Sequence, residues 1–285
     1  MIDSDEFFLT ITSFMNLSFR NTLVCTLIFT ASALTSRASF FDKLESALAT
    51  TNPPAVTSTA PAASGPSAAT LASLTPEELT SSVKELLTSG MSSALSSLGQ
   101  PGGFATNAAA TIPLPGKLQA MAEALNLSGH GASVSNFLAS LNQAAAGVVP
   151  AAVPAITDSI QNLTVTNASS ILAGPDDAAT EYFRRTSETN LYTKLYPVVQ
   201  QSTEKAGVTA QYKQLLAQYQ AVNKLGSLFG SKNTVNFPTQ DVDAFVTQKT
   251  LDGMFNTAAN EERNIRTNSV GRSALLQKVF ASVPH

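Results

Sequence analysis

The chain has 285 residues, of which 44% are hydrophobic and only 13% are charged, and its formal net charge is −3. This length allows one large domain or two small ones, and the apolar content is ample for a buried core. The slight negative charge excludes a basic surface of the kind that nucleic-acid binding requires, so no nucleic-acid partner is expected. No run of about 18–20 apolar residues occurs, so no transmembrane segment is expected in the mature chain.

The N-terminus is typical of a secretory signal peptide. An apolar run over residues 23–34 follows a basic residue, and its length suits a signal peptide rather than a membrane helix. Ser36 and Ala38 place small residues at −3 and −1, which predicts cleavage after Ala38, with Ala33 as the rival site. The acidic residues before Met15 do not suit such a signal, so Met15 is the predicted true start and the mature protein is expected to be exported.

The chain is therefore predicted to have three parts. Residues 1–38 are the N-terminal extension and signal peptide. Residues 39–73 form a short helical turn and then an Ala/Ser/Thr/Pro-rich tether, which has too little apolar surface to offset its ordering entropy. Residues 74–285 form the helical domain. The only cysteine, Cys25, lies in the signal, so the mature chain is predicted to have no disulfide and no cysteine–metal site.

The predicted domain follows the helical period of 3.6 residues. It opens at Thr75–Glu78, where a capping residue, a proline at the first helical position and acids in the first turn agree, and Gly99–Gly103 ends this helix. Further apolar stripes predict helices over 118–125, 134–145, 149–163, 191–199, 212–222, 242–265 with Asp241 as cap, and 275–280. No stretch alternates as a strand would. The predicted fold is all-α, a compact multi-helix domain of roughly eight to ten helices.

Some local details follow from residue types and spacing. Pro150 and Pro154 are expected to start or kink the helix over 149–163, because proline lacks the backbone N–H of a helix interior. Pro197 is expected to bend its helix for the same reason. Glu262 and Arg266 stand four residues apart on the helix near the C-terminus, which predicts an ion pair on one face.

The most unusual chemistry lies at one helix start in the middle of the chain. Gly174-Pro175 is expected to end one helix with a left-handed cap and to start the next. Asp176 and Asp177 then fall in the first turn, where the helix dipole stabilises an anion by about 0.3–1 kcal/mol. Glu181 and Arg185 have the i, i+4 spacing of a helical ion pair.

This stretch supplies the predicted ligand- or partner-binding residues: Asp176, Asp177, Tyr182, Arg184, Arg185 and Tyr192. Tyrosine and arginine are favoured at protein interfaces, and the start of a helix favours anions. The alternative interpretation is a well-capped helix with a solvated charged side, because exposed ion pairs are common and weak.

The search for catalytic and cofactor motifs yields little. His130 and His285 have no second histidine nearby, so no metal site is expected, and nothing indicates a cofactor. The glycines at 99–103 lack the preceding strand and the lysine of a phosphate loop. A hydrolase using His130 with Asp176 or Asp177 stays open as an alternative, since a catalytic triad assembles in space.

From Thr75 to Phe280 the chain resembles the bacterial family catalogued as domain of unknown function 4197. The residues that carry the resemblance are Gly102–Phe104, Ile112–Pro115, Leu141–Ala145, Asp176–Arg185, Val246–Phe255 and Glu261–Arg266. The resemblance implies a helical, exported protein of Gram-negative bacteria, hence a periplasmic location, and no assigned activity. The family pattern often has lysine where this chain has Thr186, so one positive charge of that face is missing here.

Three functions are consistent with the sequence. The first is a non-enzymatic envelope protein that binds a partner protein or an apolar small molecule among its helices. The second is the hydrolase. The third is a structural or assembly factor whose interaction patch contains Tyr182, Arg184, Arg185 and Tyr192.

Overall fold

The computed structural model describes residues 65–228, 242–268 and 271–280. The predictions for the signal peptide, for its cleavage site, for the helical turn before the tether and for the cap Asp241 lie outside these residues. The described residues belong to one unit, Ala60–His285.

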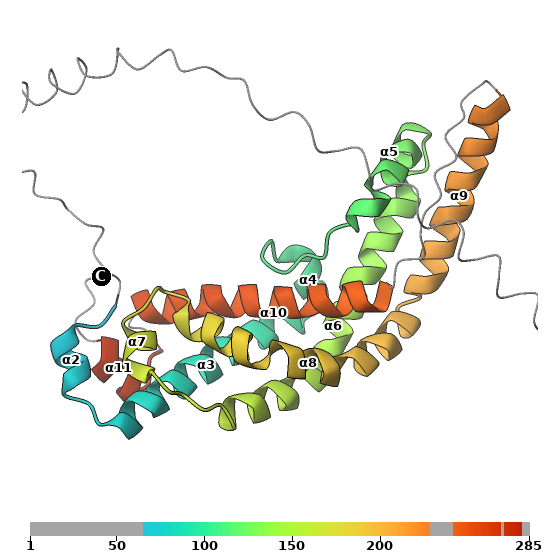
Figure 1. The fold of residues 1–285 in the computed structure, drawn as a ribbon. Coiled ribbons are helices and arrows are strands. Elements are labelled where there is room, and N and C mark those ends of the chain that lie inside the picture. Colours follow the sequence, from blue (N-terminus) through green and yellow to red (C-terminus); the bar gives the residue numbers. More distant parts are fainter. Residues whose placement is uncertain (1–64, 229–241, 269–270, 281–285) are drawn as a thin grey trace, which may run out of the picture. The chain divides into compact units, whose positions relative to one another are not determined.

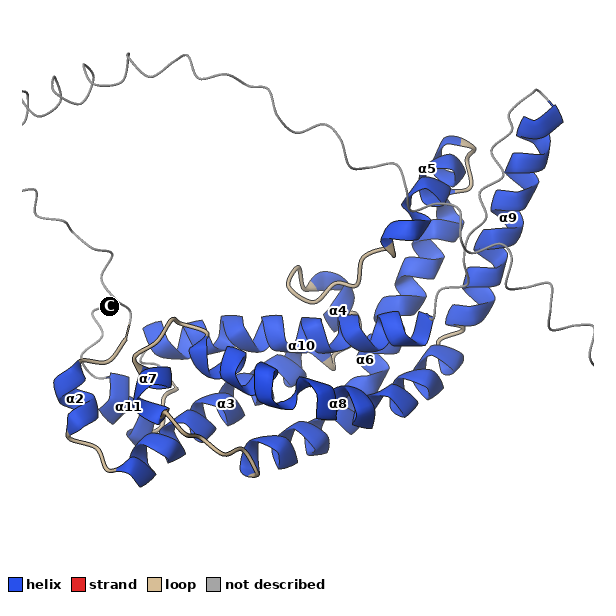
Figure 2. Ribbon diagram, in the orientation of Figure 1, coloured by secondary structure: helices blue, strands red, loops and turns tan. Residues whose placement is uncertain are grey.

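Within the described ranges every regular element is a helix and none is a strand, which confirms the all-α prediction (Figures 1 and 2). The ten α-helices and one 3₁₀ turn are α2 (Ala68–Ala72), α3 (Pro76–Leu98), α4 (Gly103–Thr106), η1 (Gly116–Leu118), α5 (Gln119–Leu127), α6 (Gly131–Gln161), α7 (Ala168–Leu172), α8 (Ala178–Lys205), α9 (Val208–Leu228), α10 (Val242–Thr267) and α11 (Ala274–Phe280).

The start of α3 confirms the predicted cap in detail. Thr75 Oγ1 accepts a hydrogen bond from the Glu78 N–H at 3.2 Å, and the Glu78 carboxylate accepts one from the Thr75 N–H at 2.8 Å. This reciprocal pair is a capping box, which satisfies two helix-end donors at once. Lys278 of α11 also donates to Glu78 at 2.8 Å, and the hydrogen bonds from Lys278 and Thr75 lower the pKa of Glu78.

Four long helices, α3, α6, α8 and α10, build the core. Helix α10 packs against both α3 and α8, and α8 also packs against α6. One glycine of α10 permits a close contact, because a Cβ at Gly253 would lie only 3.0 Å from both Phe104 and Ala110. Phe183 of α8 and Phe255 of α10 meet edge to face, with ring centroids 5.9 Å apart.

Pro150 and Pro154 do not start a separate helix over 149–163, because helix α6 runs unbroken through both for 31 residues. Helix α8 also continues through Pro197, which was predicted only to bend it. All three prolines lie on exposed positions. The apolar stripe of α6 continues past them through buried Val149, Ala152 and Ile156, so tertiary packing of this stripe outweighs the lost backbone hydrogen bonds.

Helix α6 is long and apolar enough to cross a membrane by length and composition alone. Half of its most apolar window is nevertheless buried inside the helical unit, and α6 packs against α3, α5, α8 and α9. A helix in the core of a helical domain can have the same length and composition, and the contacts of α6 identify it as such a core helix.

The predicted tether ends before residue 73. Residues 68–72 form α2, which Ser67 caps by accepting a hydrogen bond from the Thr70 N–H at 3.1 Å. Leu71 and Leu74 are buried in the common core. These two leucines explain the difference, because they give the end of an otherwise polar segment enough apolar surface to dock.

Candidate functional site

Helix α8 begins slightly later than the sequence predicted. Asp177 is its N-cap residue and Asp176 precedes it in a turn, so neither lies in the first helical turn, and the Asp177 side chain makes no capping hydrogen bond. Gly174 does not have the predicted left-handed conformation, since it is absent from the positive-φ glycines of the described chain. A Cβ there would lie 3.0 Å from the Cβ of Ala178, so close packing explains this glycine.

The N-terminus of α8 is capped by a buried carboxylate from another helix. Glu262 of α10 accepts hydrogen bonds from the N–H groups of Ala179 and Thr180, at 3.0 and 2.7 Å, and from the Thr180 hydroxyl at 2.6 Å. Its side chain is only 1% exposed. An anion at this place satisfies two helix-end donors and opposes the positive end of the helix dipole. Glu262 therefore does what the sequence assigned to Asp176 and Asp177.

Two buried arginines lie next to one another at this place, and one of them, Arg266, pairs with Glu262. Arg266 donates to it from Nε at 2.9 Å, and its Nη2 lies 2.7 Å from the carboxylate, which confirms the predicted ion pair. Arg266 also donates to the carbonyls of Leu172 and Ile171 at the end of α7. Arg272 donates to three further carbonyls, those of Ile265, Arg266 and Phe280. The two guanidinium groups lie 5.3 and 5.5 Å from the Phe280 ring. We call Glu262, Arg266, Arg272 and Phe280 the buried junction.

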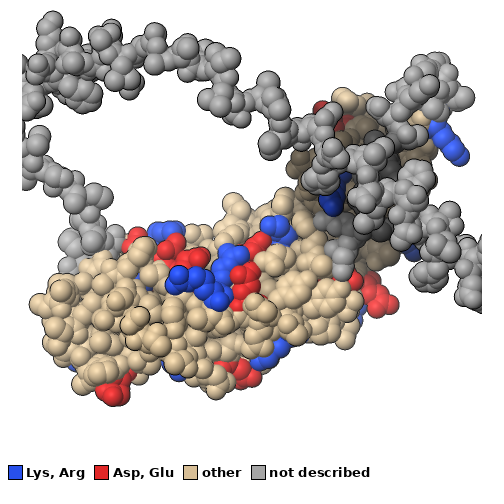
Figure 3. Space-filling view, in the orientation of Figure 1, with Lys and Arg blue, Asp and Glu red and all other residues tan. Residues whose placement is uncertain are grey.

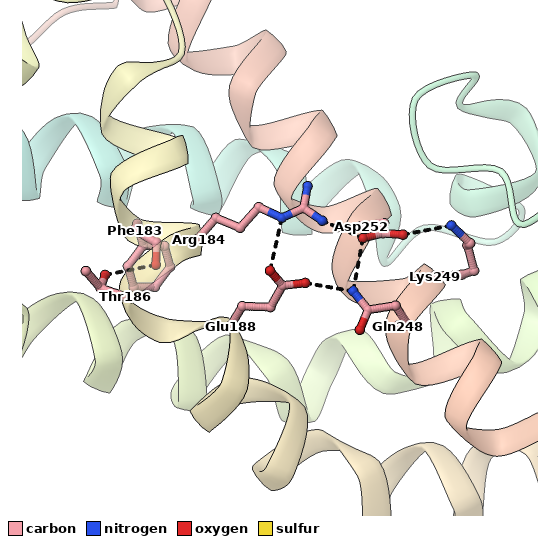
Figure 4. A network of polar contacts seen from close by, with 7 residues as sticks. All are labelled: Phe183, Arg184, Thr186, Glu188, Gln248, Lys249 and Asp252. Atoms are coloured by element: carbon pink, nitrogen blue, oxygen red, sulfur yellow. Dashed lines mark hydrogen bonds and ion pairs between the residues drawn. The ribbon is translucent and has the colours of Figure 1, made fainter. Parts of the chain in front are cut away.

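A second polar network lies farther along the same two helices (Figure 4). Arg184 of α8 donates to Glu188 at 3.2 Å and to Asp252 of α10 at 2.6 Å, and it lies 5.4 Å from the Phe255 ring centroid. Gln248 bridges the two acids, at 2.7 Å from Glu188 and 3.2 Å from Asp252, and Lys249 donates to Asp252 at 2.8 Å. We call Arg184, Glu188, Gln248, Lys249 and Asp252 the seam network.

The seam network shifts two pKa values in the direction that keeps both partners charged. Partial burial by itself lowers the pKa of Arg184, but the hydrogen bond to Glu188 and the charges of Glu188, Asp252 and Glu181 raise it above its ordinary value. Partial burial raises the pKa of Asp252, but hydrogen bonds from Lys249 and Gln248 and the charges of Lys249 and Arg184 lower it below its ordinary 3.8. The pairs are therefore ionised at neutral pH.

The sequence missed four members of this network. It predicted Arg184 alone and paired Glu181 with Arg185, whereas the ion pair that forms on α8 is Arg184–Glu188. Arg184 and Glu188 have the same i, i+4 spacing as Glu181 and Arg185, so the sequence indicated both ion pairs equally. Gln248, Lys249 and Asp252 lie on α10. They join the network only because α10 packs against α8, and the sequence does not show this contact.

The other predicted site residues lie on different sides of α8. Tyr182 donates its hydroxyl to Thr164 O at 2.6 Å, and the ring of Tyr192 stacks on Tyr196 with centroids 5.9 Å apart. Arg185 is exposed. Asp177 lies 3.8 Å from Arg263 and so approaches α10, not the arginines of α8. The six residues thus do not converge on one ligand atom.

The charged side chains of one face gather where α8 and α10 run together, and much of the remaining surface of that face is uncharged (Figure 3). Since these charges pair with one another, the seam network leaves little net field there.

Two open grooves border α8 on the side of α6. The first has a volume of about 410 Å³ and is lined, among others, by Asp158 and Ser159 of α6, Asn162 and Thr164 of the connector, and Asn190 and Lys194 of α8. The second has about 250 Å³ and is lined by residues that include Gln143, Gly147, Gln201, Ser202 and Lys205. Both have mixed polar and apolar linings, and neither is an enclosed apolar cavity.

His130 and the aspartates of the hydrolase alternative are not brought together. His130 directly precedes α6, is exposed, and has its Nδ1 3.0 Å from Ser128 O. Helix α6 is about 45 Å long, and Asp176 and Asp177 follow beyond its far end; Figure 1 shows α5 and α7 at opposite ends of the helices. Among the described residues no cluster of three or more His, Cys, Asp or Glu could hold a metal ion.

The chain matches the family described as "Protein of unknown function (DUF4197)" over residues 73–281. It belongs to this DUF4197 family. No curated protein and no solved structure is matched by the chain.

The structure explains several residues that carry the DUF4197 resemblance. Asp176–Arg185, Val246–Phe255 and Glu261–Arg266 meet where α8 and α10 pack, and they contain the buried Glu262 and Arg266 and most of the seam network. Asn142 holds the connector by accepting from the Ile112 N–H at 2.9 Å and donating to its carbonyl at 3.2 Å. These motif residues therefore hold the fold together, and the surface that α8 presents toward α6 lies outside them.

Proposed function

We propose that this protein is an exported, non-enzymatic binding protein of the bacterial envelope that captures a partner protein on the side of α8 that borders α6. The observation that carries the proposal is the first groove. Asp158, Asn190 and Lys194 line it, and all three are exposed. They offer an anion, an amide and a cation to a ligand, in a groove whose volume falls in the range of specific binding sites.

The filled interior favours a protein partner over an apolar small molecule. The aromatic side chains Phe104, Phe137, Phe183 and Phe255 are at most 2% exposed and belong to one continuous core. The open grooves beside α8 instead combine apolar surface with polar and charged side chains. A polypeptide supplies both donors and acceptors to such a surface, whereas an apolar molecule would leave its polar groups without partners.

The residues of α8 divide into structural and available groups. Arg184 is engaged with Glu188, Asp252 and Phe255, so it holds α8 on α10. Arg185 and Lys194 are exposed and join no ion pair among the described residues. A charge reversal at Arg185 or Lys194 therefore tests binding, whereas one at Arg184 also tests stability.

Crosslinking in the living envelope tests the partner. We would replace Asn190 with a photo-crosslinking amino acid and irradiate intact cells. A discrete adduct is expected, and it should weaken on the same background with Arg185→Glu and Lys194→Glu. The matched control places the crosslinker at exposed Glu123 of α5. Equal adducts at both positions, or none at Asn190, would contradict the proposal.

Export is tested separately, by fractionating the cells and sequencing the N-terminus of the mature protein. Cleavage after Ala38 gives a chain that begins at Ser39, and cleavage at the rival site gives one that begins at Leu34. A cytoplasmic protein with an uncleaved N-terminus would overturn this part of the proposal.

A further inference from the structure

The first groove lies between two helices that run in opposite directions. Ser202 of α8 donates its hydroxyl to Ala144 O of α6 at 2.7 Å. The first groove brings Asp158, later on α6, beside Asn190, earlier on α8. Helices α6 and α8 are therefore antiparallel, so positions on both can be placed along one axis with a rise of about 1.5 Å per residue.

Three polar side chains of different character follow one another along this axis. Measured from that hydrogen bond, Lys194 lies at about 12 Å, Asn190 at about 18 Å and Asp158 at about 21 Å. Asn162, the C-cap residue of α6, closes the groove at about 27 Å. The cation and the anion are thus about 9 Å apart along the groove, and an amide lies between them.

These side chains have no partner within the part of the chain that the structure describes. Asp158, Asn190 and Lys194 are exposed, and their side chains make no hydrogen bond and no ion pair there. The Asn162 amide nitrogen donates to Asp158 O at 2.9 Å, while its Oδ1 has no donor among the same residues. In the seam network opposite charges pair with one another, whereas those of the first groove stay unpaired and are available to a ligand.

The end of α6 adds to the attraction of Asp158 for a cation. The C-terminus of a helix carries the negative end of its dipole, and Asp158 lies in the last turn of α6. Lys84 of α3 donates to Gln161 O at 2.6 Å, so the chain itself already places one ammonium group at this helix end. The Asp158 carboxylate is a further anion at the same place, and it has no counter-ion among the described residues.

The lining fits a polypeptide better than a sugar or a free small molecule. None of the residues that line the groove is aromatic, so a ring-shaped ligand finds no stacking surface. The groove is open, whereas specific small-molecule sites enclose most of their ligand. The Asn190 amide offers a donor and an acceptor together, which is what a backbone peptide group requires.

We infer that the first groove binds a segment of the partner protein with an acidic side chain at Lys194, a peptide group at Asn190 and a basic side chain at Asp158. An extended chain rises about 3.3 Å per residue, so the two charged residues of the segment are about two to four positions apart. This inference rests on the proposed function and names the chemistry by which the partner is recognised.

The test uses a phage-displayed library of random heptapeptides, selected in parallel against the intact wild type, Asp158→Lys and Lys194→Glu. The wild type should enrich peptides that carry one acidic and one basic residue at the stated spacing. Asp158→Lys makes the groove doubly cationic, so it should enrich peptides with two acids. Lys194→Glu makes the groove doubly anionic and should enrich peptides with two bases. Opposite charges attract and like charges repel across an interface, so the selected composition should follow each variant.

Matched controls change the net charge by the same amount at other places. Glu123 of α5 and Lys213 of α9 are exposed, join no ion pair among the described residues and line neither groove. Glu123→Lys and Lys213→Glu should therefore enrich the same peptides as the wild type. All four variants should melt with the wild type, because each changes an exposed side chain without a partner.

Titration by fluorescence anisotropy gives the second readout. A synthetic peptide selected by the wild type should bind Asp158→Lys and Lys194→Glu at least about fivefold more weakly, and each variant should recover the affinity with its own charge-matched peptide. No enrichment, or an enriched composition that does not follow the variants, overturns the inference. Displacement of the peptide by phosphatidylethanolamine–phosphatidylcholine vesicles also overturns it, in favour of a zwitterionic lipid headgroup.

The outcome is separable from that of the proposed function. Adducts at Asn190 in cells without charge-matched peptide binding leave the partner-binding function in place and contradict the recognition chemistry. Charge-matched binding without an adduct in cells removes the envelope partner and leaves a groove that recognises a paired acid and base.

Discussion

The buried junction and the seam network join the same two helices with the same kinds of side chain, yet their environments differ. Glu262 and Arg266 are 1% and 0% exposed, and the carboxylate accepts from Ala179, Thr180 and Arg266. Arg184 and Asp252 are 24% and 21% exposed. Water can replace a lost partner in the seam network but cannot reach the junction.

Charge pairs on this fold therefore have two separate roles. In the junction each hydrogen-bonding group has no alternative partner, so it fixes how α7, α8, α10 and α11 meet. In the seam network the same chemistry adds a modest, salt-sensitive attraction. Burial, rather than residue type, separates the two, and the following changes test this distinction.

The largest expected effect is that of Glu262→Gln. It leaves Arg266 buried without its counter-ion and presents an amide to the N–H groups that start α8, so we expect a loss of about 3–5 kcal/mol in the free energy of unfolding. Chemical denaturation measures it. Glu261→Gln is the matched control: Glu261 accepts only from the Ser93 hydroxyl, at 2.9 Å, so its loss should stay below about 1 kcal/mol. Equal losses in the free energy of unfolding of the two variants would contradict the special role of burial in the junction.

Arg272→Lys should come next. The planar guanidinium serves the carbonyls of Ile265, Arg266 and Phe280 at once, and burial lowers its pKa. A lysine ammonium keeps the charge but cannot match this fork geometry, so buried carbonyls lose donors and stability falls by about 2–3 kcal/mol. Thermal unfolding at neutral pH measures the change. Arg263→Lys, at an exposed arginine of α10, should leave the melting temperature almost unchanged; a comparable drop there would argue against the role of the fork.

Asp252→Asn should cost about 1 kcal/mol at neutral pH, because it weakens a partly exposed network. The pKa of Asp252 is lowered in the folded state, so its contribution is fully present above about pH 4 and is lost as the pH falls through the lowered pKa. The stability difference between wild type and variant should thus be constant near neutrality and shrink in acid. A difference that grows as the pH falls below 4 would reverse the assigned sign.

Lys249→Ala should have the smallest effect. Lys249 is 37% exposed and contacts Asp252 alone among the pairs of the network, so its removal should cost at most about 0.5 kcal/mol. The cost should vanish at 1 M salt, where charges are screened within about 3 Å. A salt-independent loss would show that Lys249 acts through packing and would blur the distinction between the two regions.

The helices could be predicted from the sequence far better than the site. Periodic apolar residues placed the helices, and Thr75 and Glu78 capped α3 as predicted. Spacing also predicted the Glu262–Arg266 pair, although nothing local showed that it is buried. The proline positions misled because a proline signals a break only where packing does not hold both sides of the helix together.

The candidate binding residues show the same limit. Their residue types marked α8 correctly as chemically unusual, but the helix period alone could not tell which side chains face α10 and which face solvent. Arg184 donates a hydrogen bond to Asp252, which lies 68 residues away in the sequence, while its neighbour Arg185 is exposed.

The helical class, the beginning and end of α3 and the family could all be predicted from the residues, because they depend on local propensity, composition and pattern. The packing of distant segments, in contrast, makes Glu262 rather than Asp177 supply the capping carboxylate of α8, and it keeps α6 continuous through two prolines. Each of these depends on which helices meet, and hydrophobic burial between distant segments sets that choice.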